Sequence, residues 1–169
     1  HYTDPAYARV VWQALQRFGV PAGAQLRVLE PGVGAGRFLA DAPADAEIVG
    51  VEVDPIAAAV ARALYPNAQI LTESFADTRP PEEDFDVVVG NVPVGKYKVT
   101  DRKYNPGRRH SIHNHFILKS PALTRPGGIV VLITLSFWLY AYQTEHLAYD
   151  QAVTSCRLLV NPLFYQRHL

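Results

Sequence analysis

The sequence contains no methionine, a single cysteine and no long apolar run, and each absence narrows what the chain can be. One cysteine, Cys156, can neither form an internal disulfide nor complete a zinc-binding cluster, which favours a reducing compartment such as the cytoplasm. No stretch approaches the roughly 18 apolar residues of a membrane-spanning helix, and no secretion signal is recognisable. Because the chain begins at His1 without a methionine, we expect it to be one domain of a longer protein.

Net charge is also absent, but the charges are unevenly distributed. The 169 residues carry 16 basic and 16 acidic side chains. Residues 30–86 hold 12 acids against 3 bases, whereas residues 87–169 hold 10 bases against 3 acids. A hydrophobic content of 49% is enough to bury a core, so we expect a single globular domain over residues 1–169.

Apolar runs alternate with helix-type patterns along the chain. We expect strands over residues 26–29, 47–53, 68–73, 85–90 and 128–134. We expect helices from Asp4-Pro5 to Gly19, over Pro55–Leu64 and, capped by Ser111, over Ile112–Leu123. This alternation predicts an α/β, Rossmann-like fold with a doubly wound, mostly parallel sheet and helices on both faces. Ligands of such folds bind at the carboxyl ends of the strands.

A glycine-rich segment follows the first predicted strand. It reads Glu30-Pro31-Gly32-Val33-Gly34-Ala35-Gly36-Arg37-Phe38, which predicts a strand end, a tight turn and the start of a helix. A dinucleotide fingerprint would need its third glycine where Arg37 stands. Glu30 would repel a pyrophosphate but suits a ligand with an ammonium and a sulfonium, as S-adenosylmethionine has. The alternative is a plain glycine-rich connection.

The next two strand ends add candidate cofactor contacts. Glu52 stands about 20 residues after the turn, where nucleotide-binding α/β folds place the acid that binds ribose hydroxyls. Asp54 precedes Pro55, which is the pattern of a helix N-cap. Ser74 and Phe75 follow the third strand, and we expect the Phe75 ring to pack on the adenine of the cofactor.

Asn91-Val92-Pro93-Val94 follows the fourth predicted strand and suggests chemistry on an amine. An exocyclic amine on a purine is a weak nucleophile because its lone pair is delocalised into the ring. The Asn91 side-chain oxygen and the Val92 carbonyl can each accept one amine hydrogen, and Pro93 fixes the backbone between them. The alternative is a strand-end turn in which asparagine and proline occur for conformational reasons.

A basic loop leaves directly from this motif. Six bases are interleaved with tyrosines there: Lys96, Lys98, Arg102, Lys103, Arg108 and Arg109. With Asn-Pro-Gly turn chemistry at 105–107, the loop is a candidate flap that contacts the phosphates of a nucleic acid. A solvated surface loop is the alternative.

In these motifs the chain resembles the S-adenosylmethionine-dependent methyltransferases that modify adenine N6 in DNA. The resemblance covers residues 1–135 and implies cofactor contacts at Tyr2, Thr3, Val53 and Asn91 besides those above. The stretch from Gly90 through Arg125-Pro126-Gly127-Gly128 is similar to large methyltransferase–helicase proteins of phages, plasmids and defence islands. It implies a DNA substrate, a flipped target base, a role in restriction and modification, and a further target-recognition or helicase domain or subunit.

Three positions depart from the family, two of them within its Asn-Pro-Pro-aromatic motif. Val92 replaces the first proline, which the chemistry tolerates because only a backbone carbonyl is used. Val94 replaces the aromatic on which the base stacks, a contact worth about 1–3 kcal/mol, so either Tyr97, Tyr104 or Phe116 substitutes or the base binds weakly. Ser74 stands where relatives often carry an acid that reads the cofactor's adenine.

Two features stay outside this pattern. His110, His113 and His115 are close in sequence, but two of them point apart on a helix and no carboxylate completes a set, so we expect no metal site. Residues 137–169 match no motif, and we expect them to contribute core packing and the last strands of the sheet.

The sequence therefore predicts a methyltransferase domain that acts on adenine N6 in DNA. Two alternatives stay open. The substrate could instead be an RNA adenine or a protein glutamine amide, since either suits an Asn-x-Pro site. With valine at position 94, the chain could also be a catalytically silent module that binds the cofactor or DNA.

Overall fold

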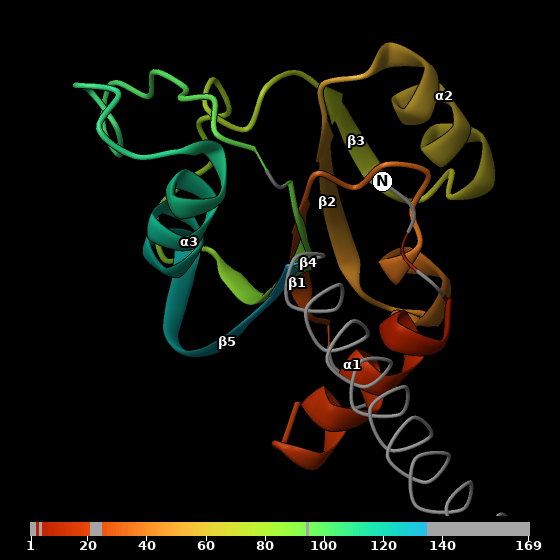
Figure 1. Cartoon of the computed structure of the whole chain (residues 1–169). Coiled ribbons are helices and arrows are strands. Elements are labelled where there is room, and N and C mark those ends of the chain that lie inside the picture. The colour runs from red at the N-terminus through yellow and green to blue at the C-terminus, as the bar shows by residue number, and fades with distance from the viewer. Residues whose placement is uncertain (1–2, 4, 21–24, 94, 135–169) are drawn as a thin grey trace, which may run out of the picture. The chain divides into compact units, whose positions relative to one another are not determined.

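The computed structural model describes residues 3, 5–20, 25–93 and 95–134 (Figure 1). The chain divides into two compact units, residues 1–134 and 135–169, and the described residues all belong to the first. Tyr2, Val94 and the tail 137–169, for which the sequence made predictions, lie outside the described residues.

Five strands form one sheet in which every described pair is parallel. They are β1 (Arg27–Pro31), β2 (Glu47–Glu52), β3 (Gln69–Thr72), β4 (Phe85–Val92) and β5 (Thr124–Thr134). Their order in space is β3-β2-β1-β4-β5, so the chain winds outward from β1 to one edge and then returns to build the other half. The direction of winding reverses between β1 and β4, which is where ligands of doubly wound sheets bind.

Helices cover both faces of the sheet (Figure 1). On one face lie α1 (Pro5–Arg17), the 3-10 turn η1 (Phe38–Asp41) and α2 (Pro55–Leu64). The other face carries α3 (Ile112–Leu123). No helix among the described residues is both long and apolar enough to cross a bilayer. The predicted fold class, a doubly wound α/β sheet with helices on both faces, is confirmed.

Strand residues alternate between these two layers. Val28, Val87 and Val89 pack with α1 and η1, whereas Leu29 and Val88 pack with α3. Because β1 and β4 are covered on both sides, their residues are apolar almost without interruption, as expected for central parallel strands. The pairing of β1 with β4 fixes the positions of the two strand ends relative to each other.

The α1 layer is joined to the glycine-rich segment by one buried hydrogen bond. The Trp12 indole N–H donates to the Phe38 carbonyl at 2.7 Å, and the Trp12 side chain is 2% exposed. A buried tryptophan needs such a partner for its N–H. This contact fixes the chain where it leaves the glycine turn.

Several element boundaries differ from the sequence predictions. The glycine turn leads into the four-residue turn η1 and not into a longer helix. β4 continues to Val92, so Asn91 lies inside the strand, and β5 begins four residues earlier than predicted, at Thr124. An irregularity in register between Phe85 and Val87 lets the Arg125-Pro126-Gly127-Gly128 segment join the strand. Ser111 occupies the N-cap position of α3, but its side chain caps no backbone amide.

Loss of the indole N–H tests the joint between α1 and η1. We expect Trp12→Phe to lower the free energy of unfolding by about 1–3 kcal/mol, because the Phe38 carbonyl is left buried without a donor. Urea unfolding measures the change. Phe18→Leu is the matched control, since Phe18 is 76% exposed and its replacement should stay within about 0.5 kcal/mol. Equal stabilities for the wild type and Trp12→Phe would contradict this role.

Candidate active site

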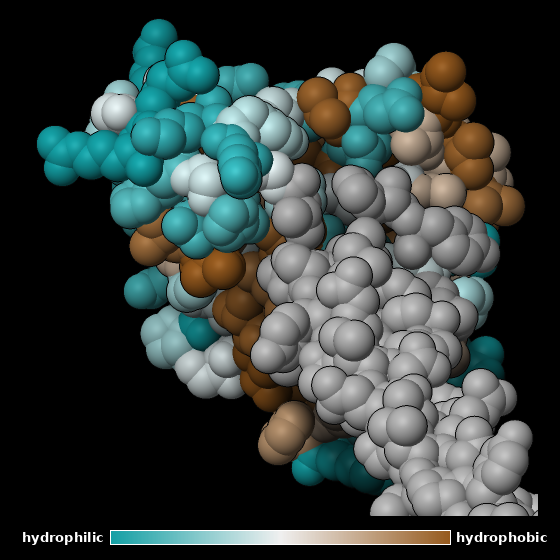
Figure 2. All heavy atoms as spheres, in the orientation of Figure 1, coloured by the Kyte–Doolittle hydropathy of each residue, from teal (hydrophilic) through white to brown (hydrophobic). Residues whose placement is uncertain are grey.

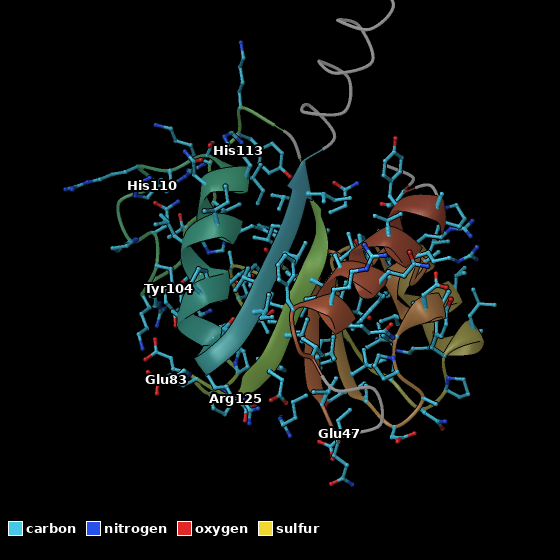
Figure 3. The ribbon with its side chains drawn as sticks, turned by 90° about the horizontal axis from the view of Figure 1, so that it is seen from below. Glu47, Glu83, Tyr104, His110, His113 and Arg125 are labelled. Atoms are coloured by element: carbon cyan, nitrogen blue, oxygen red, sulfur yellow. The ribbon has the colours of Figure 1, made fainter. Side chains whose placement is uncertain are left out.

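Three polar side chains lie at the carboxyl ends of neighbouring strands. Glu30 lies near the end of β1, Glu52 at the end of β2 and Asn91 near the end of β4. The order β2-β1-β4 places them on one edge of the sheet. Figure 3 shows Glu47, Glu83 and Arg125 together at the opposite edge, where strands begin, and His110 and His113 at the far end of α3 from them.

The glycine turn is built to leave space beside β1. Gly32, Gly34 and Gly36 have φ values of 73°, 54° and 83°, which side chains other than glycine rarely adopt. The amides of Gly32 and Val33 donate to the Val51 carbonyl at 2.7 and 3.0 Å, which ties the turn to β2. A Cβ at position 34 would meet nothing within 4 Å, whereas one at position 36 would collide with the Tyr65 ring. Gly34 therefore faces open space, and Gly36 permits packing against α2.

Glu30 is a buried carboxyl group beside this turn. It is 2% exposed, and its Oε2 atom has no hydrogen-bond partner among the described residues. Burial, and then the nearby charge of Glu52, raise the pKa of Glu30 well above its ordinary value. An acid held in this way needs a cation to ionise readily, because an uncompensated buried charge is costly. The site therefore fits a ligand that brings a positive charge to Glu30.

Glu52 joins the glycine turn to the end of β2 through hydrogen bonds. Its Oε2 atom accepts a hydrogen bond from the Gly34 amide and its Oε1 atom accepts one from the Asp54 amide, both at 2.8 Å. Each carboxylate oxygen retains a lone pair for a further donor such as a ribose hydroxyl. Asp54 caps α2, since its Oδ1 atom accepts from the Ile56 amide at 2.9 Å, so the N-cap prediction is confirmed. Val53, between the two acids, is 68% exposed.

The amide of Asn91 offers an acceptor at the end of β4. Its Nδ2 atom donates to Thr3 Oγ1 at 3.1 Å, while Oδ1 is buried and has no donor among the described residues. This bond places Thr3 beside Asn91. Gly90 lets β1 approach closely, because a Cβ there would lie 3.1 Å from the Pro31 carbonyl.

Some predicted cofactor contacts prove to be core residues. Val33 and Phe38 are 3% and 1% exposed and pack on the α1 and α2 face. Val92 is 2% exposed, and its side chain packs in the α3 core. Pro31 is buried at the end of β1, and Pro93 is half-buried directly after β4.

Phe75 also belongs to the core. Its ring is 4% exposed and lies 4.8 Å, between centroids, from the Phe116 ring. The neighbouring Ser74 hydroxyl accepts from the Ala76 amide at 3.2 Å and shapes the turn after β3. Packing of Phe75 on a cofactor adenine stays a prediction.

The six basic residues of the predicted flap are all exposed, and hydrophilic side chains cover this part of the molecular surface in Figure 2. Two of them have protein partners: Lys103 forms an ion pair with Glu82 at 2.6 Å, and Arg108 donates to the Lys98 carbonyl at 3.0 Å. The loop is internally ordered by Asn105, whose Nδ2 atom donates to the carbonyls of Val99 and His110.

The three rings that might replace an aromatic at position 94 differ in accessibility. Tyr97 is 59% exposed, and its ring lies directly against Gly95, where a Cβ would come within 2.6 Å of Cε1. Tyr104 is half-buried and donates its hydroxyl to Glu82 at 2.5 Å. Phe116 is 5% exposed and near Gly32. Tyr97 is therefore the ring with the most free surface.

Sequence reasoning missed a buried group of charged residues beneath the flap. Asp101, His115 and Lys119 are each fully buried, and Asp101 contacts both of the others. His115 lies in the first turn of α3, and Lys119 follows one turn later. No group of three potential metal ligands occurs within the described ranges. The only sequence signal was a lysine and a histidine spaced four apart on the apolar side of a helix.

Comparisons with known proteins agree with this architecture. Residues 29–93, from β1 to just past Asn91, match the family model described as a methyltransferase domain. The chain is 27% identical over 138 residues to Defense against restriction protein B of Escherichia phage P1, and 27% identical over 161 residues to the type II methyltransferase M.XamI of Xanthomonas campestris pv. amaranthicola. These alignments cover 79% and 82% of the chain but only 6% and 30% of the two relatives.

Solved structures share the fold at low identity. The type I restriction-modification methyltransferase subunit of Streptococcus thermophilus superimposes with a TM-score of 0.63 at 16% identity, over 79% of this chain and 34% of that one. An S-adenosylmethionine-dependent O-methyltransferase of Thermotoga maritima gives 0.56 at 15% identity, over 78% and 44%. The order and parallel pairing of the strands are those of the class I methyltransferase fold, and the glycine turn and the buried acid beside it lie within the segment that matches the methyltransferase model.

Proposed function

We propose that this domain transfers the methyl group of S-adenosylmethionine to the exocyclic N6 amine of adenine in DNA. The observation that carries the proposal is the unpartnered Asn91 Oδ1 atom, on the strand next to Glu30 and buried with it at one edge of the sheet. An acceptor without a donor is costly in a buried site, so a ligand with an N–H group fits it.

The carboxyl ends of β1 and β2, which carry Glu30 and Glu52, would hold the cofactor. Glu30 fits its ammonium, Glu52 its ribose hydroxyls, and the open side of Gly34 permits close approach to the backbone. When bound, S-adenosylmethionine supplies a methyl group activated by the positive sulfur. Thr3 keeps the Asn91 amide oriented with its oxygen free.

The protein's part in the reaction is to make the amine a better nucleophile. Asn91 Oδ1 accepts one amine hydrogen and the Val92 carbonyl accepts the other, which favours a pyramidal nitrogen with a localised lone pair. Bound S-adenosylmethionine would give its methyl group to this nitrogen and leave as a neutral thioether, and the methylated amine would release its extra proton to water. No charged base is required at Asn91.

Two observations support DNA as the substrate. The exposed bases of residues 96–109 give this side of the domain a positive surface directly beyond Pro93, which suits a phosphate backbone. M.XamI is a type II methyltransferase, and the S. thermophilus structure is a restriction-modification subunit. Tyr97 would provide the stacking surface for a flipped base, because it is exposed and lies near the motif.

Recognition of a DNA sequence would come from another part of the whole protein. The chain spans 6% and 30% of the two relatives, so both have ample further length for a target-recognition or helicase domain or subunit. Contacts of the exposed basic side chains with a phosphate backbone would position the DNA but carry no sequence information.

Substitution of Asn91 tests the reaction. We expect Asn91→Ala to lower transfer of labelled methyl from S-adenosylmethionine to mixed-sequence unmodified DNA by about 100-fold or more, because an aligned transition-state acceptor is lost. Cofactor affinity, measured by calorimetry, should change much less. Asn67→Ala, at an exposed asparagine beyond α2, is the matched control and should retain activity.

The same assay separates the alternative substrates. Parallel reactions with RNA and with glutamine-containing peptides should give little incorporation. Preferential transfer to either would replace DNA as the substrate. Cofactor binding without transfer to any of the three would contradict the proposal and indicate a silent binding module.

Substitution of Glu30 tests the cofactor site. Because burial raises its folded pKa, this carboxyl group costs the free protein stability as the pH rises from 4.5 through the folded pKa. We therefore expect Glu30→Gln to be more stable than the wild type to urea at pH 8, with the difference vanishing at low pH. Its affinity for S-adenosylmethionine should fall by about tenfold or more, since a charged hydrogen bond is lost. A variant that binds the cofactor normally would exclude Glu30 as the ammonium partner.

A further inference from the structure

A cluster of ionisable groups is buried between α3 and the basic loop, apart from Asn91 and the two acids of the strand ends. Asp101 comes from the loop, and His115 and Lys119 come from successive turns of α3. Their side chains are 0%, 0% and 1% exposed. We call these three residues the buried charge cluster. Full burial of a lysine and an aspartate is rare unless they are paired.

Asp101 holds the basic loop from inside. Its Oδ2 atom accepts from Lys119 Nζ and lies 3.0 Å from His115 Nε2, while its Oδ1 atom accepts from the backbone amides of Lys103 and Tyr104. One carboxylate therefore fixes both a turn of the loop and two side chains of α3. Its backbone also exchanges hydrogen bonds with Asn105, the residue that orders the rest of the loop.

Lys119 extends the connection to the loop after β3. Its Nζ atom donates to the carbonyls of Phe75 and Thr78, the latter at 2.8 Å, as well as to Asp101 at 3.0 Å. All three ammonium hydrogens thus have an acceptor. A single side chain ties together the segment after β3, the flap after β4 and the helix between β4 and β5.

The electrostatics favour the charged pair. Burial opposes ionisation of Asp101, but hydrogen bonds from His115, Lys119 and the loop amides outweigh it and hold the pKa of Asp101 below its ordinary value. Burial lowers the pKa values of His115 and Lys119, and the charge of Asp101 opposes both shifts. Arg79, half exposed and 3.9 Å from Asp101, adds a second cation at the rim.

We propose that Asp101, His115 and Lys119 are positioning residues, which hold the basic loop and the loop after β3 in fixed relation to the strand ends. The assignment of these loops to substrate and cofactor rests on the proposed function. A hydrophobic contact could pack the loop, but only a donor with three hydrogens satisfies carbonyls from one loop and a carboxylate from the other. Lys119 is therefore the residue whose hydrogen bonds join both loops, whereas the hydrogen bonds of Asp101 join the flap to α3.

Tryptic cleavage tests these separate roles of Asp101 and Lys119, because trypsin cleaves after lysine and arginine and the chain has such residues both in the flap and in the helices. Lys96, Lys98, Arg102, Lys103, Arg108 and Arg109 lie in the flap, whereas Arg17 and Arg62 lie in scaffold helices. We expect Asp101→Asn to raise the rate of cleavage within 96–109 by about tenfold or more, since hydrogen bonds to a charged group are lost. Cleavage at Arg17 and Arg62 should not rise in parallel.

Cofactor affinity separates the two variants. Lys119→Met should raise flap cleavage and also weaken S-adenosylmethionine binding several-fold in calorimetry, whereas Asp101→Asn should leave that affinity within about twofold, since the bonds to Phe75 and Thr78 remain. Glu82→Gln is the matched control, because Glu82 holds the same loop from the surface through Lys103 and Tyr104. It should change flap cleavage little, as exposed ion pairs contribute little.

A double variant separates loosening of the flap from destabilisation of the whole domain. Asp101→Asn combined with Lys119→Met removes both buried charges, so it should unfold at a higher temperature than either single variant yet keep the fast flap cleavage. Cleavage that rises equally in the flap and the scaffold, or that returns to the wild-type rate in the double variant, would overturn the proposal and leave the cluster with a stabilising role only. Neither readout depends on methyl transfer, so failure of the proposed function is detected separately.

Discussion

The structure depends on the parallel pairing of β1 with β4, which brings the buried acid Glu30 and the half-buried amide of Asn91 to the carboxyl ends of the strands. Val28 and Leu29 pair with Val87 and Val88, so the ends of the two strands lie in fixed register. Glu30 and Asn91 follow from that register, and each presents an oxygen that lacks a partner among the described residues. Apolar packing on both faces supplies the stability that offsets two polar groups left unsatisfied.

Two groups of polar side chains lie near the carboxyl ends of the strands, and they differ in whether their hydrogen bonds are satisfied within the protein. At the strand ends, Glu30 and Asn91 leave acceptors open, which suits a ligand that supplies donors and positive charge. Beneath the flap, Asp101 forms hydrogen bonds with both His115 and Lys119. The His115 Nδ1 atom has no partner among the described residues. The first arrangement suits binding, whereas the second suits rigid support of loops that would otherwise carry exposed backbone.

The sequence predicted the sheet, the glycine turn and α2 because each rests on local patterns. Pro55–Leu64 is confirmed residue for residue, with Asp54 as its cap. The directions of the Phe38 and Phe75 rings could not be predicted, since a motif gives a position and not the direction of a side chain, and both rings pack in the core. Lys119 could not be predicted because its three acceptors are 18 to 44 residues away in sequence and meet only in the folded sheet.

The central claim is that the cofactor binds across the carboxyl ends of β1, β2 and β4. A crystal structure with S-adenosylhomocysteine tests this claim most directly. We predict that the ligand's ammonium contacts Glu30, its ribose hydroxyls contact Glu52, and its sulfur faces the side chain of Asn91. A ligand whose ammonium lies away from Glu30, or whose sulfur is directed away from β4, would contradict the placement of the chemistry at this edge.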